Sequence, residues 1–263
     1  MIGRATARLE PRSRRWLVQL WGQPNIHTRQ RWTAVWPCLA QLPAGPLHVL
    51  DAGCGGGAWS LELALRRREW SITGVDRFEP SLKAAETARR RLAVENVSFV
   101  YSDFLDFQPP EQFDVVLSIA SAHYLLQEGS GEELFKRFGS WLRPGGLLLL
   151  FAPRCRREVP WFRLLPPPFE LRDVVSAEPL RSLCRIGGLE VRTITPVIGV
   201  LGTLAKQISH AVSQSWFLRL ATYPAQMMLT ALDRLLGARN PSGRSSGLVL
   251  VAERRGGQPG YIL

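Results

Sequence analysis

The sequence has little that would mark a metalloprotein, a disulfide-rich protein or an integral membrane protein. Its four cysteines are widely spaced and form no Cys-x-x-Cys pair, so we expect reduced thiols, no zinc site and no bound metal. They are Cys38, Cys54, Cys155 and Cys184. The longest apolar runs, 146–152 and 197–205, fall well short of the roughly 20 residues that span a bilayer, so no transmembrane helix is predicted.

Lysine is also scarce, although the chain is strongly basic. Lysine occurs only at positions 83, 136 and 206, while the net charge is +11 and the pI is near 10.5. The arginines are spread along the chain, with short clusters at 66–68, 89–91, 154–157 and 254–255. Such a pI lies in the range of nucleic-acid-binding proteins. Two interpretations remain open: a solvated basic surface, or a patch whose partner is RNA or an anionic membrane.

Length and composition are those of a globular enzyme. The chain has 263 residues, of which 46% are hydrophobic and 21% are charged, enough for one large core or a core with a subdomain. The first 21 residues contain several arginines and no apolar secretory core, so we expect a cytoplasmic protein.

The most informative segment is the glycine-rich stretch at 49–57. An apolar run ends in Asp51, breaks into glycines, and is followed by helical spacing from Ala58, which predicts a strand, a tight turn and a helix. Such a turn can serve packing alone, and Gly53 and Gly55 also fit a dinucleotide fingerprint. The Asp51 carboxylate is expected to point to where a pyrophosphate would lie, which favours a cationic ligand over NAD.

Two further acids follow apolar runs at similar places. The run 71–76 ends in Asp76 about 20 residues after the glycines, and the run 97–101 leads into Asp103 and Phe104. The segments 113–125 and 142–150 then predict a fourth and a fifth strand. In the order and spacing of these five segments, residues 47–151 resemble the class I S-adenosylmethionine-dependent methyltransferases.

The resemblance implies a fold and a cofactor site. The expected fold is α/β, a Rossmann-like three-layer sandwich with a seven-stranded, mostly parallel sheet whose last strand is antiparallel. The implied cofactor is S-adenosylmethionine, with Asp76 on the ribose and with Asp103 and Phe104 at the adenine. The full set of cofactor residues is Asp51, Gly53, Cys54, Gly55, Asp76, Arg77, Asp103, Phe104 and Ser118. Asp114 is expected to support the fold instead.

His123 and Tyr124 are the candidates for catalysis. They follow the predicted fourth strand on the side that faces the transferred methyl in the family. The titration range of histidine suits a general base, although a histidine in this loop can equally be a wall residue.

The predicted organisation is a helical N-terminal cap at 1–45, a cofactor-binding core at 46–196, an insertion at 197–246, and a final strand with a tail at 247–263. The cap contains Trp16, Trp21, Trp32 and Trp36 among many arginines. His27 and Arg31 share one helical face, for which a surface role is expected. Residues 160–169 predict a rigid aromatic loop, because prolines exclude a helix or a central strand.

The insertion is predicted to contain two helices with apolar stripes, one on each side of a connecting segment at 216–223. It can serve as a lid, as a dimer interface, or, through 204–236, as a peripheral membrane contact that also admits a lipid-like acceptor.

The predicted function is methyl transfer to a small or amphipathic acceptor, such as a lipid-linked compound or a secondary metabolite. Two alternatives stay open. An RNA methyltransferase would use the basic surface, but Ser118-Ile119-Ala120-Ser121 stands where an Asn-Pro-Pro-Tyr tetrapeptide would be expected. A non-catalytic scaffold would be expected to lack some of the cofactor acids, yet Asp51, Asp76 and Asp103 are all present.

Overall fold

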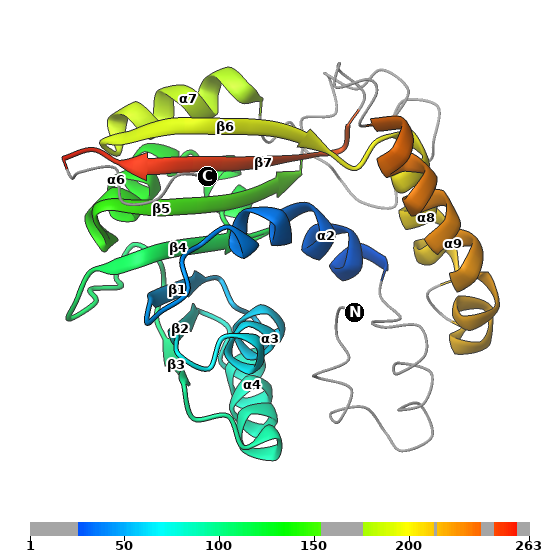
Figure 1. Ribbon diagram of the computed structural model, residues 1–263, viewed down its shortest axis with the longest axis horizontal. Helices are drawn as coiled ribbons and strands as arrows, with labels where there is room; N and C mark the ends of the chain where they lie inside the picture. Colours follow the sequence, from blue (N-terminus) through cyan, green and yellow to red (C-terminus); the bar gives the residue numbers. More distant parts are fainter. Residues whose placement is uncertain (1–25, 154–175, 213–214, 238–244, 257–263) are drawn as a thin grey trace.

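A computed structural model describes residues 26–153, 176–212, 215–237 and 245–256 (Figure 1). The predictions made for Trp16, Trp21, Cys155 and the aromatic loop at 160–169 concern residues outside these ranges.

The described residues form one seven-stranded sheet, and the predicted fold is confirmed. The strand order is β3-β2-β1-β4-β5-β7-β6, and β7 is antiparallel to both neighbours, while the other paired strands run parallel. The strands are β1 His48–Ala52, β2 Ser71–Asp76, β3 Val97–Tyr101, β4 Phe113–Ile119, β5 Leu142–Pro153, β6 Leu189–Val197 and β7 Gly247–Arg254. The order reverses between β1 and β4, and ligands of open α/β sheets bind at the carboxyl ends of strands flanking such a point.

Helices cover both faces of the sheet, giving three layers (Figure 1). Successive strand residues point to opposite faces, so Val115 and Leu117 join one buried cluster and Val116 joins the other. The first cluster contains residues of α2 and α3, and the second contains residues of α6 and α7. The core helices are α3 Ala58–Arg66, α4 Glu79–Leu92, α5 His123–Gln127, α6 Gly131–Trp141 and α7 Ala177–Ile186.

Helix α2 Ile26–Ala40 lies over the face of the sheet that α3 also covers, and α8 Val200–Ala211 and α9 Trp216–Gly237 pack together at the end of the sheet where α2 begins (Figure 1). Gln30 of α2 donates from Nε2 to the Gly202 carbonyl of α8 at 2.8 Å and to Thr230 Oγ1 of α9 at 3.0 Å. Ile26 packs with Ala205 and Tyr223 in a small buried cluster. The N-terminal helix and the insertion therefore form one unit beside the sheet.

The structure corrects one local prediction. Residues 216–223, expected between two helices, are the first turns of α9, which continues through Pro224 because the helix has a buried partner in α8. The predicted fifth strand is β5, whose pairing with β4 shifts register between Phe113 and Val115.

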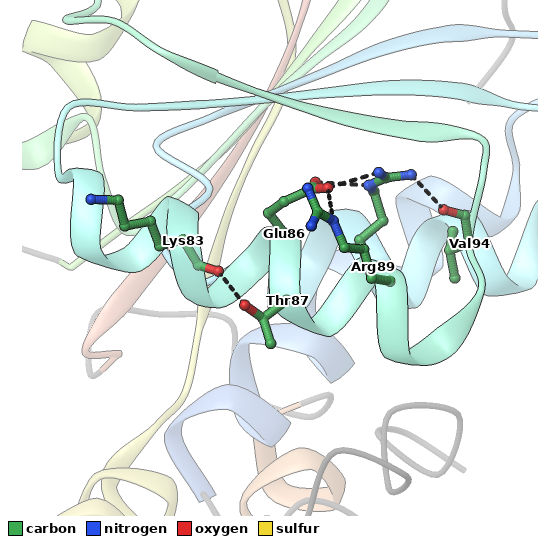
Figure 2. Close-up of polar contacts among 6 residues, drawn as sticks. Lys83, Glu86, Thr87, Arg89 and Val94 are labelled. Carbon is green, nitrogen blue, oxygen red and sulfur yellow. Dashed lines mark hydrogen bonds and ion pairs between the residues drawn. The ribbon is translucent and has the colours of Figure 1, made fainter.

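Part of the arginine excess is neutralised locally. On α4, Glu86 accepts hydrogen bonds from Arg89 and from Arg90, and Arg89 also donates to the Val94 carbonyl at 3.2 Å (Figure 2). These bonds hold the pKa of Glu86 down at about 2. Arg66 pairs with Glu62 at 2.7 Å and lies over the rings of Trp32 and Trp36. These arginines stabilise helix ends, which is a structural use of positive charge.

Candidate functional site

The glycine-rich turn after β1 is built from glycines with different roles. Gly53 and Gly55 both have positive φ, at 81° and 52°. A Cβ on Gly53 would lie 2.2 Å from the Cβ of Ser121, so this glycine is required by the protein's own packing. No atom lies within 4 Å of a Cβ placed on Gly55. The open side of the turn is therefore at Gly55, where a ligand can approach the backbone.

Asp76, at the end of β2, is tied to this turn. Its Oδ2 accepts a hydrogen bond from the Gly55 amide at 2.8 Å, and its Oδ1 accepts one from the Phe78 amide at 2.9 Å. Each carboxylate oxygen keeps a second lone pair, so both can still accept a ligand hydroxyl. The carboxylate is oriented before any ligand binds.

A pocket of about 300 Å³ opens at the carboxyl ends of β1, β2 and β4. It is lined by Gly53, Asp76, Arg77, Phe78, Ser102, Asp103, Phe104, Ala120, Ser121, Tyr124 and Leu125. Two acids, several aromatic rings and a backbone turn are the chemistry that a nucleoside needs: acceptors for the ribose hydroxyls and apolar faces for a base. The lining therefore fits S-adenosylmethionine.

The part of this pocket formed by the residues that follow β3 carries an ion pair. Arg77 Nη1 lies 3.3 Å from Asp103 Oδ2, and Asp103 Oδ1 accepts from the Leu105 amide at 3.1 Å. Phe104 packs edge-on against Trp141, with ring centroids 6.5 Å apart. The backbone and the second aromatic ring thus hold Asp103 and Phe104 in place.

Asp51 lies differently from the expectation. It is 1% exposed and does not line the pocket, and its Oδ2 accepts a hydrogen bond from Ser60 Oγ at 2.6 Å. Burial raises its pKa to about 6, against the opposing effect of the Ser60 hydrogen bond. The carboxylate thus points to Ser60 in the first turn of α3 and away from the pocket lining.

Cys54 and Ser118 also lie behind the pocket wall. Cys54 is buried, with its sulfur 2.9 Å from where a Cβ of Gly74 would be, and burial raises the pKa of its thiol strongly. Ser118 is fully buried and shares a 2.9 Å hydrogen bond with Ser121 Oγ. Ser121 in turn donates to the Ala52 carbonyl at 2.7 Å. Ser118 can thus affect a ligand only through Ser121.

His123 and Tyr124 begin α5 beside the pocket. Their ring centroids are 4.1 Å apart, and Tyr124 is exposed and lines the pocket, whereas His123 does not line it. His123 Nδ1 is buried without a hydrogen-bond partner among the described residues. Burial, aided by the charge of Arg31, lowers the pKa of His123 to about 4. The imidazole is therefore neutral at pH 7, and its protonated form is disfavoured.

The sequence interpretation missed five pocket residues: Phe78, Ser102, Ala120, Ser121 and Leu125. Ala120 has a φ of 59°, which is strained for a residue other than glycine, and its amide donates to the Phe151 carbonyl at 2.9 Å. This strained turn brings Ser121 over Gly53. Only the proximity of small residues to the end of a predicted strand could have suggested it.

Comparison with known proteins agrees with this geometry. Residues 49–146 match the family model described as "Methyltransferase domain". These residues form a class I S-adenosylmethionine-dependent methyltransferase domain, the class that the strand order and the pocket define.

Three relatives illustrate the range of similarity. The chain is 32% identical to trans-aconitate 2-methyltransferase of Paracidovorax citrulli over 147 residues, which cover 55% of this chain and 51% of the relative. It is 35% identical to the release factor glutamine methyltransferase of Escherichia coli over 80 residues, which cover 30% and 29%. The crystal structure of geranyl diphosphate C-methyltransferase from Streptomyces coelicolor superposes with a TM-score of 0.61 at 16% identity, covering 94% of this chain and 87% of that one.

The chain spans between 24% and 52% of the length of the curated relatives that it matches. The structural likeness extends further but, at 16% identity, shows the fold alone.

Proposed function

We propose that this protein transfers a methyl group from S-adenosylmethionine to a small or amphipathic acceptor. The observation that carries the proposal is the pocket at the switch point of the sheet, where Asp76 and Asp103 are both held in place by backbone amides. When bound, the cofactor supplies an electrophilic methyl group on a sulfonium.

The protein's own contribution is alignment. Asp76 receives the ribose, Asp103 and Phe104 receive the adenine, and the open side of the Gly55 turn receives the remaining part of the cofactor. Holding two reactants in line can account for roughly 7 to 11 kcal/mol of a barrier. His123, next to the pocket residue Tyr124, is the candidate base for a hydroxyl acceptor, although burial lowers its pKa to about 4 and so makes it a weak base at neutral pH. An amine acceptor needs no such base.

Similar proteins support a small acceptor. Two of the three are named as methyltransferases of small molecules, trans-aconitate and geranyl diphosphate. The third is named as a methyltransferase of a protein, the release factor. The local pairing of Arg66, Arg89 and Arg90 with acids leaves less free positive surface for RNA, which was the alternative acceptor.

Helix α9 supports an amphipathic acceptor, because it carries its polar side inward. Gln226, Thr230 and Asp233 are buried, and Asp233 accepts hydrogen bonds from the amides of Gly199 and Leu201 at the start of α8. Apart from Arg234, the exposed side chains described on α9 are apolar. The largest are Phe217, Leu218, Met228, Leu232, Leu235 and Leu236, each at least 40% exposed. We call this surface the α9 face.

A continuous apolar face on a water-soluble protein favours an interaction. The occupant that we propose is an anionic membrane surface. Residues 1–25 contain five arginines and one acid, and they join the chain at Ile26, which packs with Ala205 of α8 and Tyr223 of α9. Their arginines can supply the positive charge that interfacial binding to an anionic membrane needs. Among the helices described, none is long and apolar enough to cross a membrane.

The test of the cofactor is calorimetric titration of the purified protein with S-adenosylhomocysteine and with NAD. We expect binding of the first and no binding of the second. Tight NAD binding without a response to S-adenosylhomocysteine would overturn the methyltransferase proposal. If RNA copurifies with the protein and methyl transfer requires that RNA, then the acceptor is RNA and not a small molecule.

The test of the membrane contact is sedimentation with vesicles of phosphatidylcholine, with and without phosphatidylserine. We expect binding to the anionic vesicles only, weakened by salt, and lost in Met228→Glu/Leu235→Glu. Ala84→Glu/Thr87→Glu, at two exposed positions of helix α4, adds the same two negative charges without touching the α9 face and is the control. A dimer that is broken by the α9 variant, without vesicle binding, would instead assign the face to a second copy.

A further inference from the structure

A group of cationic side chains lies next to the cofactor pocket and is not used by the cofactor residues. Arg31 comes from α2 and Lys206 from α8, and Gln30, the neighbour of Arg31, donates to the Gly202 carbonyl one turn before Lys206. Burial and then the charge of Arg31 lower the pKa of both Lys206 and His123, in agreement with one shared neighbourhood. Arg31 Cζ lies 5.8 Å from the ring centroid of Phe151, near the end of β5. Arg31 thus lies inward, contrary to the surface role expected from the sequence.

The position of Arg31 is fixed by its neighbour in the chain. Gln30 is 2% exposed and bonds to both α8 and α9, which docks this turn of α2 against the helix that carries Lys206. Phe151 accepts a hydrogen bond from the Ala120 amide, in the turn that leads to His123. Four elements, α2, α5, α8 and β5, therefore meet around the guanidinium.

Within the described residues, these groups lack the partners that buried polar atoms normally have. Arg31 Nε and His123 Nδ1 are both buried and unpartnered. Lys206 Nζ reaches only Ser246 Oγ, at 3.5 Å, and forms no ion pair with a described acid. The charge of Asp233 raises the pKa of Lys206, but the two Asp233 carboxylate oxygens already accept hydrogen bonds from the amides of Gly199 and Leu201.

Two desolvated cations that have no counterion among the described residues are unfavourable in the free protein. Burial lowers the pKa of Arg31, and burial together with the charge of Arg31 lowers the pKa of Lys206 to about 7. A buried donor left without a partner costs free energy that a ligand can recover by accepting from it. The ligand that does this for a guanidinium and an ammonium together is an oxyanion.

We propose that Arg31 and Lys206 bind a carboxylate or phosphate group of the methyl acceptor. This assignment rests on the proposed methyltransferase function and names the acceptor as an oxyanion. The site lies beside His123 and Tyr124, so an acceptor anchored there by its anionic group presents its remaining atoms to the pocket where Tyr124 lies.

The experiment uses citrate and inorganic pyrophosphate as probes, titrated by calorimetry into the full-length protein saturated with S-adenosylhomocysteine. We expect at least one of the two oxyanions to bind. Arg31→Gln and Lys206→Gln should each weaken that binding by about tenfold or more, as expected for loss of a charge-assisted hydrogen bond. Lys206→Arg should keep it, and Arg91→Gln, an exposed arginine of α4, is the control for net charge.

The outcomes separate this inference from the proposed function. If S-adenosylhomocysteine binds with unchanged affinity in all variants and neither probe binds the wild type, the oxyanion site is wrong and the methyltransferase proposal stands. Equal weakening by Arg91→Gln would also overturn the site, because the probes would then sense charge alone. If the wild type does not bind S-adenosylhomocysteine, the proposed function fails. Should Arg31→Gln not fold, as judged by its melting curve, the pair Lys206→Gln and Lys206→Arg decides the question.

Discussion

The amide of Gly55 donates a 2.8 Å hydrogen bond to Asp76 Oδ2, joining the turn after β1 to the end of β2. Gly55 thereby has two roles: it shapes the open side of the turn, and its amide orients the Asp76 carboxylate. Because Phe78 holds the other oxygen at 2.9 Å, the carboxylate is held from both sides.

Replacing Asp76 should weaken cofactor binding. Asp76→Ala removes charge-assisted hydrogen bonds to the ribose together with the support of the Gly55 amide, so we expect a loss of roughly 1.5 to 3 kcal/mol in S-adenosylhomocysteine binding. Calorimetry measures it. Asp106→Ala removes an exposed acid that does not line the pocket, and it should bind S-adenosylhomocysteine as the wild type does. Equal affinity in Asp76→Ala and the wild type would show that another group binds the ribose.

Gly53→Ala and Gly56→Ala should behave differently although both add one methyl group. At Gly53 the new Cβ would lie 2.2 Å from the Cβ of Ser121 and the φ of 81° is unfavourable, so we expect a loss of stability of about 1 to 3 kcal/mol and of cofactor binding. At Gly56 nothing lies within 4 Å of the Cβ, and we expect a change within about 0.5 kcal/mol. Chemical denaturation measures both. Two equally stable variants would mean that the turn relaxes at little cost.

Asp51→Asn should make the protein without cofactor more stable at neutral pH. Burial raises the pKa of Asp51 from 3.8 to about 6, so the folded state resists ionisation, and the wild type loses stability as pH rises through that window. The penalty is complete above pH 6 and amounts to about 3 kcal/mol at most. An asparagine oxygen can still accept the Ser60 hydroxyl.

The measurement is the difference in unfolding free energy between Asp51→Asn and the wild type at pH 4 and at pH 8. We expect almost no difference at pH 4 and a gain for the variant at pH 8. Ser60→Ala, which leaves the carboxylate without its hydrogen bond, should be less stable than the wild type at pH 8. A constant difference across the pH range would show that Asp51 titrates normally.

His123 should influence stability in the opposite direction. Its pKa is lowered to about 4, so the folded state favours the neutral ring, and this contribution is present above pH 6.5 and lost as pH falls toward 4. His123→Gln should therefore lose less stability than the wild type between pH 6.5 and 4. Thermal unfolding at fixed ionic strength measures it. His48→Gln, a partly exposed histidine at the start of β1, is the matched control, and an identical acid response in both variants would contradict the assignment.

The sequence alone determined the core fold, because its signals are local. Apolar runs of strand length, turn glycines and helical spacing predict elements one at a time, and their order matches the family. Asp76, Asp103 and Phe104 could be placed at one edge because each follows a parallel strand, and parallel strands of one sheet end on the same side. Asp76 and Asp103 line the same pocket.

Only the tertiary structure decided which way side chains face. Asp51 follows the same strand pattern as Asp76, yet it bonds to Ser60 and is buried, because the chain reverses at Gly53. The apolar stripe of α9 was predicted to be a helix face, but whether a helix hides its apolar or its polar side depends on its neighbours. Here α8 and α2 offer amides and a glutamine to Asp233 and Thr230, so the polar side is buried and the apolar side is exposed. Hydrogen bonds between residues 32 to 200 positions apart leave no periodic signal in a sequence.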